Sequence, residues 1–270
     1  MVPVALTIAG SDSGGGAGIQ ADLKTFHQFG VFGTTAIVAL TAQNTLGVTA
    51  VHPVPADLVD AQLAALAADL PPDAVKTGML ATAPLVRQVA AALERYAWHR
   101  YVLDPVMVAT SGHRLLDVAA EREVADRLVP LALVVTPNLD EAAILTGRPV
   151  RTPDDMARAG ETLLGLGAAA ALVKGGHLPG DRLTDVLVTA AGIERFERPR
   201  VPTTSTHGTG CTLSAALTAG LAAWAAGGGS GDPPLRHIVS RSLDYLDRAI
   251  RSAPGLGGGH GPVNHWAPTG

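Results

Sequence analysis

Short apolar runs alternate along the chain with longer stretches rich in Ala and Leu. The short runs are rich in β-branched residues and too short for helices, so they predict strands that are buried on both faces. The predicted strands are residues 4–9, 35–40, 74–77, 101–103, 133–135 and 170–173, and the predicted helices are residues 19–29, 58–69, 84–96, 121–128 and 156–166. Alternating strands and helices are typical of an α/β fold with a mostly parallel sheet that helices cover on both faces.

The pattern changes after Lys174. Two runs, 183–189 and 193–197, predict a β-hairpin. Two further helices are predicted at 213–224 and 235–251, joined by a flexible connector rich in Gly and Ser. No linker composition interrupts the middle of the chain and no internal repeat is found, so we expect residues 1–270 to form a single domain.

Composition narrows the class of protein. The formal net charge is -4 and the sequence pI is about 6.1, so no basic surface is predicted for nucleic acid. The single cysteine, Cys211, excludes an internal disulfide, and no Cys/His cluster has zinc-ligand spacing. The apolar stretch closest to membrane-spanning length, residues 213–226, is too short. We therefore expect a cytoplasmic protein without a nucleic-acid or membrane partner.

Polar side chains follow nearly every predicted strand. Ligands of open α/β sheets bind outside the carboxyl ends of the strands. Six unrelated solvated loops are a poor explanation for this pattern, which therefore predicts an enzyme. In strand order, the polar groups are Gly10-Ser11-Asp12, Gln43-Asn44, Gly78-Met79, Asp104, Asn138 with Glu141, and Lys174.

The first of these stretches is rich in glycine and connects a strand to a helix over residues 10–18. It is not a dinucleotide-binding turn, because the second strand leads into Thr41-Ala42-Gln43 without an acid for a ribose. It also lacks the Gly-Lys-Ser/Thr ending of a P-loop. Two interpretations remain, which are close approach of the backbone to a small substrate and simple turn geometry.

Two side chains near this stretch are candidates for small-molecule recognition. The amide of Gln43 offers a donor and an acceptor, which complements a heterocycle that has a ring nitrogen beside an exocyclic amine. A solvated loop residue is the alternative for Gln43. Asp22 lies one helical turn beyond Gly18, so it either points back toward the end of the first strand or is a surface acid on an amphipathic helix.

Oxygen donors and one lysine indicate a nucleotide site. Asp104, Asn138 and Glu141 carry oxygen ligands of the kind that Mg²⁺ uses when it accompanies phosphates. Asn138 is equally explained as the N-cap of a helix over residues 139–145. Lys174 ends an apolar strand just before a glycine pair, a position suited to binding phosphate as a point charge.

Residues 206–211 form a glycine-rich turn ahead of the penultimate predicted helix. Backbone N–H groups at a helix N-terminus bind anions, so Gly208, Thr209, Gly210 and Cys211 are candidate catalytic residues that receive the charge of a transferring phosphoryl group. The same position predicts that the thiol of Cys211 ionises more easily than a free one, which makes it a candidate base beside the acceptor hydroxyl. A small buried thiol on a turn is the alternative.

Together these motifs resemble those of the hydroxymethylpyrimidine/phosphomethylpyrimidine kinases. The matching stretches are residues 7–25, 41–45, 76–80, 104–108, 173–177, 206–211 and 259–265, so the resemblance covers essentially the full chain. It implies a ribokinase-like three-layer fold with a small β-hairpin as a lid element. It also implies that ATP and Mg²⁺ are used to phosphorylate 4-amino-5-hydroxymethyl-2-methylpyrimidine and then its monophosphate, in thiamine biosynthesis.

The resemblance also implies roles for individual residues. Gln43 would bind the aminopyrimidine edge, Met79 and Val106 would pack against the ring, Asp22 would lie near the hydroxymethyl group, and Gly10 would belong to the same pocket.

The nucleotide side of the site follows in the same way. Asn138 and Glu141 match the Asn-x-x-Glu element associated with Mg²⁺ and phosphate, with Lys174 at the nucleotide and Asp104 at the metal. The resemblance also implies a homodimer.

Three other functions fit parts of the sequence. Pyridoxal kinase has the same fold and acts on a ring with a hydroxymethyl acceptor. A non-catalytic pyrimidine-binding sensor would keep the pocket but would need neither Lys174 nor Asp104 and Glu141. A cysteine-dependent hydrolase would need a base close to Cys211, for which the adjacent His207 is the only local candidate.

Overall fold

A nine-stranded sheet runs through the computed structural model, which describes residues 1–107 and 118–270. The strands lie in the order β3-β2-β1-β4-β5-β6-β7-β8-β9. The six predicted strands are confirmed and pair in parallel, and antiparallel strands extend the sheet at both edges. The parallel strands are β1 (Val4–Gly10), β2 (Phe32–Asn44), β4 (Ala74–Thr77), β5 (Tyr101–Leu103), β6 (Val134–Val135) and β7 (Ala170–Val173). The antiparallel strands are β3 (Gly47–Pro53), β8 (Arg182–Thr189) and β9 (Gly192–Pro199).

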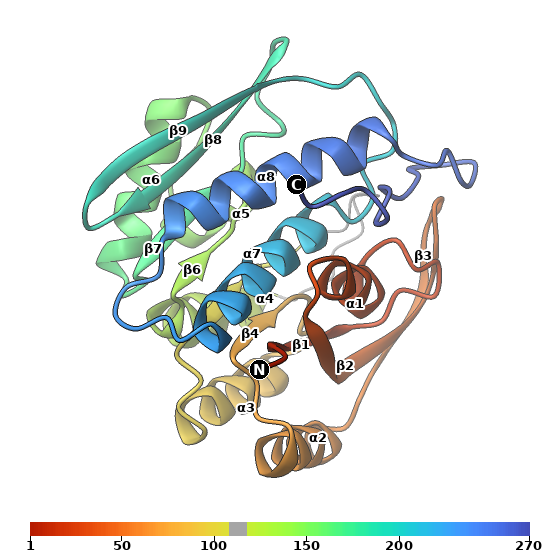
Figure 1. The fold of residues 1–270 in the computed structure, drawn as a ribbon, viewed down its shortest axis with the longest axis vertical. Helices are drawn as coiled ribbons and strands as arrows, with labels where there is room; N and C mark the ends of the chain where they lie inside the picture. The colour runs from red at the N-terminus through yellow and green to blue at the C-terminus, as the bar shows by residue number, and fades with distance from the viewer. Residues whose placement is uncertain (108–117) are drawn as a thin grey trace.

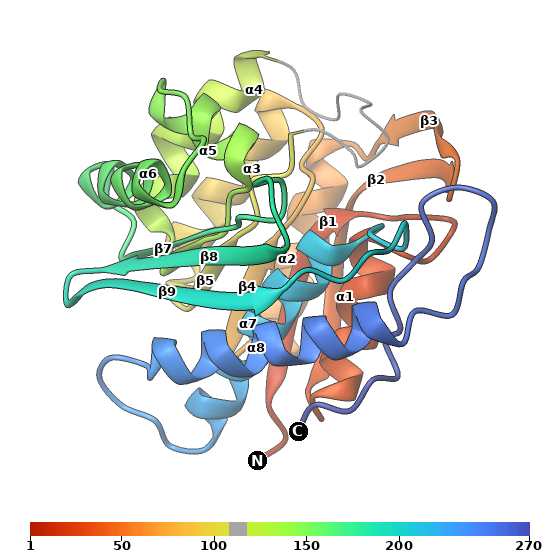
Figure 2. The same ribbon diagram turned by 90° about the horizontal axis from the view of Figure 1, so that it is seen from above.

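Helices cover both faces of the sheet and complete three layers (Figures 1 and 2). One face carries α1 (Gly18–Gln28), α7 (Thr209–Ala226) and α8 (Leu235–Arg251). The other face carries α2 (Ala56–Asp69), α3 (Ala83–Arg95), α4 (Val118–Glu123), α5 (Leu139–Thr146) and α6 (Pro153–Gly165). Helix α4 continues into a π-helical turn (Val124–Leu128) and a 3₁₀ turn (Val129–Leu131).

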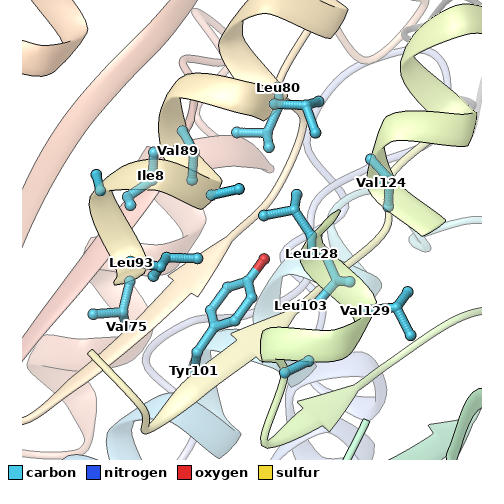
Figure 3. Close-up of a cluster of buried hydrophobic side chains, with 14 of the residues drawn as sticks. Ile8, Val75, Leu80, Val89, Leu93, Tyr101, Leu103, Val124, Leu128 and Val129 are labelled. Carbon is cyan, nitrogen blue, oxygen red and sulfur yellow. The ribbon is translucent and has the colours of Figure 1, made fainter. Parts of the chain in front are cut away.

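Apolar side chains from the sheet and from the helices α2 to α6 form the larger core cluster (Figure 3). Tyr101 on β5 lies at its centre, among Leu80, Leu93 and Leu128. The buried phenol of Tyr101 shares a 2.6 Å hydrogen bond with the hydroxyl of Thr77. Its burial therefore leaves no polar atom without a partner.

The structure corrects the prediction at β2. This strand runs on to Asn44 and pairs with β3, an edge strand that the sequence did not reveal. Gln43 consequently lies inside an antiparallel arm, paired with Val48, and not beyond a strand end as predicted. None of residues 41–53 is buried and β3 is largely exposed, so this arm carries no pattern of buried positions that a sequence could display.

Helix α7 packs against the sheet behind the site. It begins at Thr209, whereas the sequence predicted residue 213, so Cys211 lies in its first turn. Among residues 1–107 and 118–270 it is the one helix long and apolar enough to cross a membrane. More than half of it is buried against α1, α8 and the sheet, which is the environment of a core helix in a packed protein.

Val108, the last residue of the motif 104–108, lies outside the described residues.

Candidate active site

A cavity of about 780 Å³ opens where the parallel strands end. It brings together side chains and turns that lie far apart in the sequence. Asp22 is the one predicted site residue that does not line it within the described part of the chain. The predicted residues that do are Gly10, Gln43, Met79, Asp104, Val106, Asn138, Glu141, Lys174, Gly208, Thr209, Gly210 and Cys211.

Asp22 lies beneath the cavity floor, fully buried between α1 and the sheet. Its carboxylate accepts a 2.7 Å hydrogen bond from Lys76 Nζ and a 2.6 Å hydrogen bond from the hydroxyl of Thr7. The alternative that Asp22 is a surface acid is therefore wrong. Burial opposes the charge of Lys76, but the carboxylates of Asp22 and Asp104 outweigh burial and raise the pKa of the lysine.

Lys76 lines the cavity floor, and sequence reasoning missed it as a functional candidate. The signal was present, because a lysine inside the four-residue buried strand β4 must have a buried partner to be tolerated. That partner, Asp22, lies 54 positions earlier, and only the tertiary structure identifies it.

Lys174 stands at the centre of the polar side of the cavity. Its Nζ donates to Asp104 Oδ1 at 3.1 Å and lies 3.9 Å from Glu141 Oε2. Ser214 on α7 donates a further 3.1 Å hydrogen bond to Asp104. A side chain at Gly210 would place its Cβ 3.3 Å from Lys174 Nζ, so glycine lets the turn approach the lysine.

The two carboxyl groups beside Lys174 titrate differently. Burial opposes ionisation of Asp104, but the ammonium groups of Lys174 and Lys76 outweigh it and lower the pKa. Burial raises the pKa of Glu141 to about 7, with the charge of Asp104 adding to the rise and Lys174 opposing it. The charged form is thus favoured at Asp104, whereas burial favours the protonated form of Glu141.

Asn138 is the N-cap of α5, which confirms the capping interpretation. Its side-chain oxygen accepts from the N–H of Glu141 at 2.9 Å, and Glu141 Oε2 accepts from the N–H of Asn138 at 2.8 Å. This reciprocal capping box explains the Asn-x-x-Glu spacing without any ligand. Both residues also line the cavity, so the cap presents them to it.

The donor set suits a metal ion that arrives with a nucleotide. Within residues 1–107 and 118–270, no three His, Cys, Asp or Glu side chains form a group that could hold a metal by themselves. Mg²⁺ in nucleotide sites is bound through one or two carboxylates, several waters and the substrate phosphates. Asp104 and Glu141 supply two carboxylates beside Lys174, and this arrangement fits that mode of binding.

The glycine-rich turn ahead of α7 is the candidate anion site. Gly208 has a φ of +78°, and a Cβ there would lie 1.8 Å from the carbonyl oxygen of Gly16, so only glycine fits. The N–H of Thr209 donates to the carbonyl of Thr206 at 3.3 Å. The N–H groups of Gly210 and Cys211 belong to the first helical turn and have no acceptor within the helix.

The prediction of an easily ionised thiol at Cys211 is wrong. Burial raises the pKa of this thiol to about 12. The ammonium of Lys76 lowers it, but the carboxylates of Asp22 and Asp104 act in the opposite direction. A favourable helix N-terminus is thus outweighed by loss of solvent and by nearby negative charge. Cys211 carries a neutral thiol at pH 7.

Sequence reasoning also missed a pair that joins the two glycine-rich turns. The imidazole Nε2 of His207 lies 2.8 Å from Asp12 Oδ2. Asp12 additionally accepts from the backbone N–H groups of Gly14, Gly16 and Ala17 at 2.8–2.9 Å. Burial opposes its charge, but the hydrogen bond and charge of His207 and these N–H groups lower its pKa. His207 is bound to Asp12, which leaves the hydrolase hypothesis without its base.

Comparison with known proteins decides the family. A family model described as phosphomethylpyrimidine kinase matches residues 12–264. The chain belongs to this family. The hydroxymethylpyrimidine/phosphomethylpyrimidine kinase of Rhizobium meliloti is 50% identical over 269 residues, which cover 98% of each chain. That of Bacillus subtilis is 45% identical over 97% of this chain and 94% of its own.

Solved structures confirm the ribokinase-like fold of this member of the phosphomethylpyrimidine kinase family. A Bacillus subtilis pyridoxal kinase, solved as an ADP complex, has a TM-score of 0.88 at 36% identity, over 99% of this chain and 98% of its own. A phosphomethylpyrimidine kinase of Clostridium difficile has a TM-score of 0.80 at 40% identity, over 92% and 99%. The chain is therefore a kinase, and the hypotheses of a hydrolase and of a non-catalytic sensor are wrong.

Proposed function

We propose that this kinase transfers the γ-phosphoryl group of ATP to 4-amino-5-hydroxymethyl-2-methylpyrimidine and then phosphorylates the monophosphate to the diphosphate, as a step of thiamine biosynthesis. The relatives that match over nearly their full length carry the name of this activity. The observation that carries the proposal is a single cavity with two ends. One end has a heterocycle-binding amide, and the other has a lysine, two carboxylates and a helix N-terminus.

The pyrimidine end combines one polar edge with apolar walls. Gln43 presents its amide to the cavity, and Met79 and Val106 line it beside the ring position. A Cβ at Gly10 would lie 2.6 Å from Met79 Cε, so glycine keeps this methionine in place. Lys76 replaces Asp22 as the group that faces the hydroxymethyl, and the buried carboxylate of Asp22 acts through it.

The phosphate end neutralises charge. Lys174 and the N–H groups of Gly210 and Cys211 converge on the region where the phosphoryl group passes, and removal of one such donor typically costs on the order of 10²–10³ in rate. Asp104 and Glu141 would hold Mg²⁺, with Asn138 at the nucleotide. When it is bound with ATP, Mg²⁺ neutralises charge on the phosphate oxygens.

The acceptor hydroxyl must lose its proton during transfer, and Cys211 remains the candidate to receive it. A neutral thiol has no place for that proton, so Cys211 would receive it only as the thiolate, which is a minor form at pH 7 because burial raises its pKa to about 12. The demand on this base is small, since phosphoryl transfer through a loose transition state relies mainly on positioning and charge neutralisation. Cys211→Ala should then lower kcat strongly and leave the Kd of the pyrimidine nearly unchanged. Normal turnover by this variant would assign the whole effect to the backbone N–H groups.

Pyridoxal is the second candidate acceptor, because a specific observation favours it. Pyridoxal kinases are among the solved structures most like this chain, including one from Staphylococcus aureus bound to pyridoxal, at a TM-score of 0.89 and 32% identity over 99% of this chain and 94% of its own. Identity to the pyrimidine kinases is higher, at 45–50%. Steady-state kcat/KM on both acceptors decides between them. A higher value for pyridoxal would overturn the proposal, and mass spectrometry of the products shows whether the second phosphate is added.

We also propose that the chain acts as a single-domain homodimer in the cytoplasm. The continuous nine-stranded sheet supports one domain. Light scattering after size exclusion should give twice the chain mass of 27.5 kDa.

A further inference from the structure

Lys174 is anchored on both sides of its Cα atom. Its own N–H donates to the carbonyl oxygen of Pro137 at 2.8 Å, and the N–H of the next residue, Gly175, donates to Asp185 Oδ1 at 2.8 Å. Because a peptide unit is planar, these two bonds restrain the two peptide planes that flank the Cα of Lys174. They consequently restrain the direction in which the lysine side chain leaves the backbone.

The second of these anchors is a side chain. Asp185 is buried on β8, the strand that pairs antiparallel with β7. Its other oxygen, Oδ2, accepts a hydrogen bond from the guanidinium of Arg198 on β9. Hydrogen bonds to a carboxylate are roughly twice as strong as those between neutral groups. Asp185 therefore gives the first N–H group beyond Lys174 a strong acceptor.

A glycine lets the chain reach this acceptor. A Cβ at Gly175 would lie 1.8 Å from the carbonyl oxygen of Thr184, so any larger residue would push the backbone away from β8. The close approach and the hydrogen bond to Asp185 thus belong together, since the backbone N–H meets the carboxylate only where the Cβ is missing.

The rest of the turn has a support of its own. The guanidinium of Arg200, just beyond β9, donates to the carbonyl oxygens of Gly176, Leu178 and Gly180. Loss of the hydrogen bond to Asp185 would therefore release the peptide next to the lysine without releasing the whole turn.

A lysine that binds phosphate depends on such an anchor. Nζ of Lys174 donates to Asp104 at 3.1 Å and lies 3.9 Å from Glu141 Oε2. Phosphate oxygens would take the place of these carboxylates at Nζ, so the tip of the side chain would lose its contacts with the protein. Because the four-carbon stem of lysine is flexible, the position of the backbone then decides where the ammonium group can lie.

We infer that Asp185 is a positioning residue for Lys174: it holds the N–H of Gly175 and thereby the direction in which the phosphate-binding lysine enters the cavity. The inference deepens the proposed function and rests on it for the role of Lys174 at the nucleotide. Asp185 acts through the lysine and not on the reacting atoms.

Two double variants separate the acceptor from the ion pair. Asp185→Asn with Arg198→Met removes both charges and keeps an amide oxygen for the N–H of Gly175. Asp185→Leu with Arg198→Met removes that acceptor as well, at nearly the same side-chain size. Replacement of a buried ion pair by neutral residues of similar volume is often neutral for stability. NH1 of Arg198 is also buried without a hydrogen-bond partner within residues 1–107 and 118–270, so we expect both variants to fold.

Kinetics should distinguish the two double variants. The KM for ATP should be roughly tenfold higher in the Leu form than in the Asn form, because one hydrogen bond that places Lys174 is lost. The Kd for the pyrimidine should differ less than about twofold, since the Gln43 end of the cavity is untouched. Equal KM values, or a parallel loss of pyrimidine affinity, would overturn the inference.

An exposed ion pair of the same hairpin provides the matched control. Arg182→Met with Glu197→Gln removes a β8–β9 pair that does not touch the turn, so the KM for ATP should stay at the wild-type value. A rise in KM as large as that of the Leu form would assign the effect to the hairpin in general and overturn the inference.

A third background tests whether Asp185 acts through the lysine. In Lys174→Met no ammonium group remains to be placed, so kcat/KM for ATP should differ less than about twofold between the Asn and Leu forms. A tenfold difference that persists in this background would mean that the residue at position 185 contacts the nucleotide directly, which would overturn the inference.

A measurement without ligand keeps this inference separate from the proposed function. Proton–nitrogen correlation spectra of wild type and of the Asn form should show an amide proton of Gly175 that exchanges slowly, and the Leu form should lose this protection. Rapid exchange in wild type would overturn the inference whatever the enzyme phosphorylates. A normal KM for ATP in Lys174→Met alone, with the spectra as expected, would instead refute the proposed role of Lys174.

Discussion

Two buried lysine–carboxylate pairs stand at the carboxyl edge of the parallel sheet and differ in what surrounds them. In the sealed pair, Lys76 and Asp22, both side chains are 0% exposed and the nitrogen–oxygen distance is 2.7 Å. In the open pair, Lys174 and Asp104, the distance is 3.1 Å and the lysine is 15% exposed. Lys174 also has a second carboxylate, Glu141, at 3.9 Å, whereas the acid of the sealed pair has a hydroxyl of Thr7.

The difference separates a pair that must stay together from one that can exchange partners. A sealed pair cannot be opened without leaving an uncompensated charge in the protein interior. The open pair lies on the wall of the cavity, where phosphate oxygens can take the place of carboxylate oxygens at Lys174. Lys76, on β4, thus holds the floor of the cavity together, whereas Lys174, which follows β7, serves phosphate binding.

The sealed pair should show the largest effect on stability. Lys76→Met removes the partner of Asp22, whose pKa burial raises, so this acid must either stay charged in the interior or take up a proton, and the free energy of unfolding should fall by about 3–5 kcal/mol in urea titrations. The double variant Lys76→Met with Asp22→Asn should recover much of this loss, because no charge then remains. A loss below about 1 kcal/mol in the single variant would mean that the pair is no stronger than a surface salt bridge.

The open pair should instead affect catalysis. Lys174→Met should lower kcat/KM for ATP on the order of 10²–10³-fold, mainly through KM, while stability falls less than for Lys76→Met because Ser214 and Thr136 still donate to Asp104. Arg236→Met on the surface of α8 is a matched control for the lost charge and should be neutral. If Lys174→Met were the less stable of the two lysine variants, the contrast between the pairs would fail.

The second acid of the open pair predicts a pH dependence. The pKa of Glu141 rises from 4.5 to about 7 on folding, so the folded chain keeps a proton that the unfolded chain releases. The contribution of Glu141 to the free energy of unfolding is complete below pH 4.5 and is lost as the pH rises through about 7. The total loss is about 3 kcal/mol. Urea titrations of wild type and Glu141→Gln across this range isolate the contribution. A constant difference between them would show that Glu141 titrates normally.

The smallest effect concerns the cap that presents this acid. Asn138→Ala should lower stability by about 1 kcal/mol, because α5 loses its N-cap, whereas Asn138→Ser keeps a capping oxygen and should be nearly neutral. Kinetics of the Ser variant then test the nucleotide role separately. A normal KM for ATP in Asn138→Ser would show that Asn138 only caps α5. Glu141 would then be the one residue of this cap that acts beside the open pair.

Much of the site could be predicted because its residues follow local patterns. Lys174 after an apolar strand and Gly210 before a helix are both recognisable within a few residues of sequence. Gln43 was identified from its chemistry, although its strand pairing was not, since an exposed arm has no periodic burial. The pKa of the Cys211 thiol was predicted wrongly for a different reason. The helix N-terminus, which lowers a thiol pKa, is visible in the local sequence, whereas burial, which raises it, depends on segments far away in the sequence.

The sequence by itself determined the alternation of strands and helices, the glycine-rich turns and the end of the sheet at which polar groups gather, since each depends on neighbouring residues. Only the tertiary structure decided which polar groups meet. Lys76 finds Asp22 across 54 positions, and His207 finds Asp12 across 195. These contacts, and the loss of solvent that raises the pKa of the Cys211 thiol, arise when distant segments pack together, because electrostatic interactions depend on distance in space and on burial.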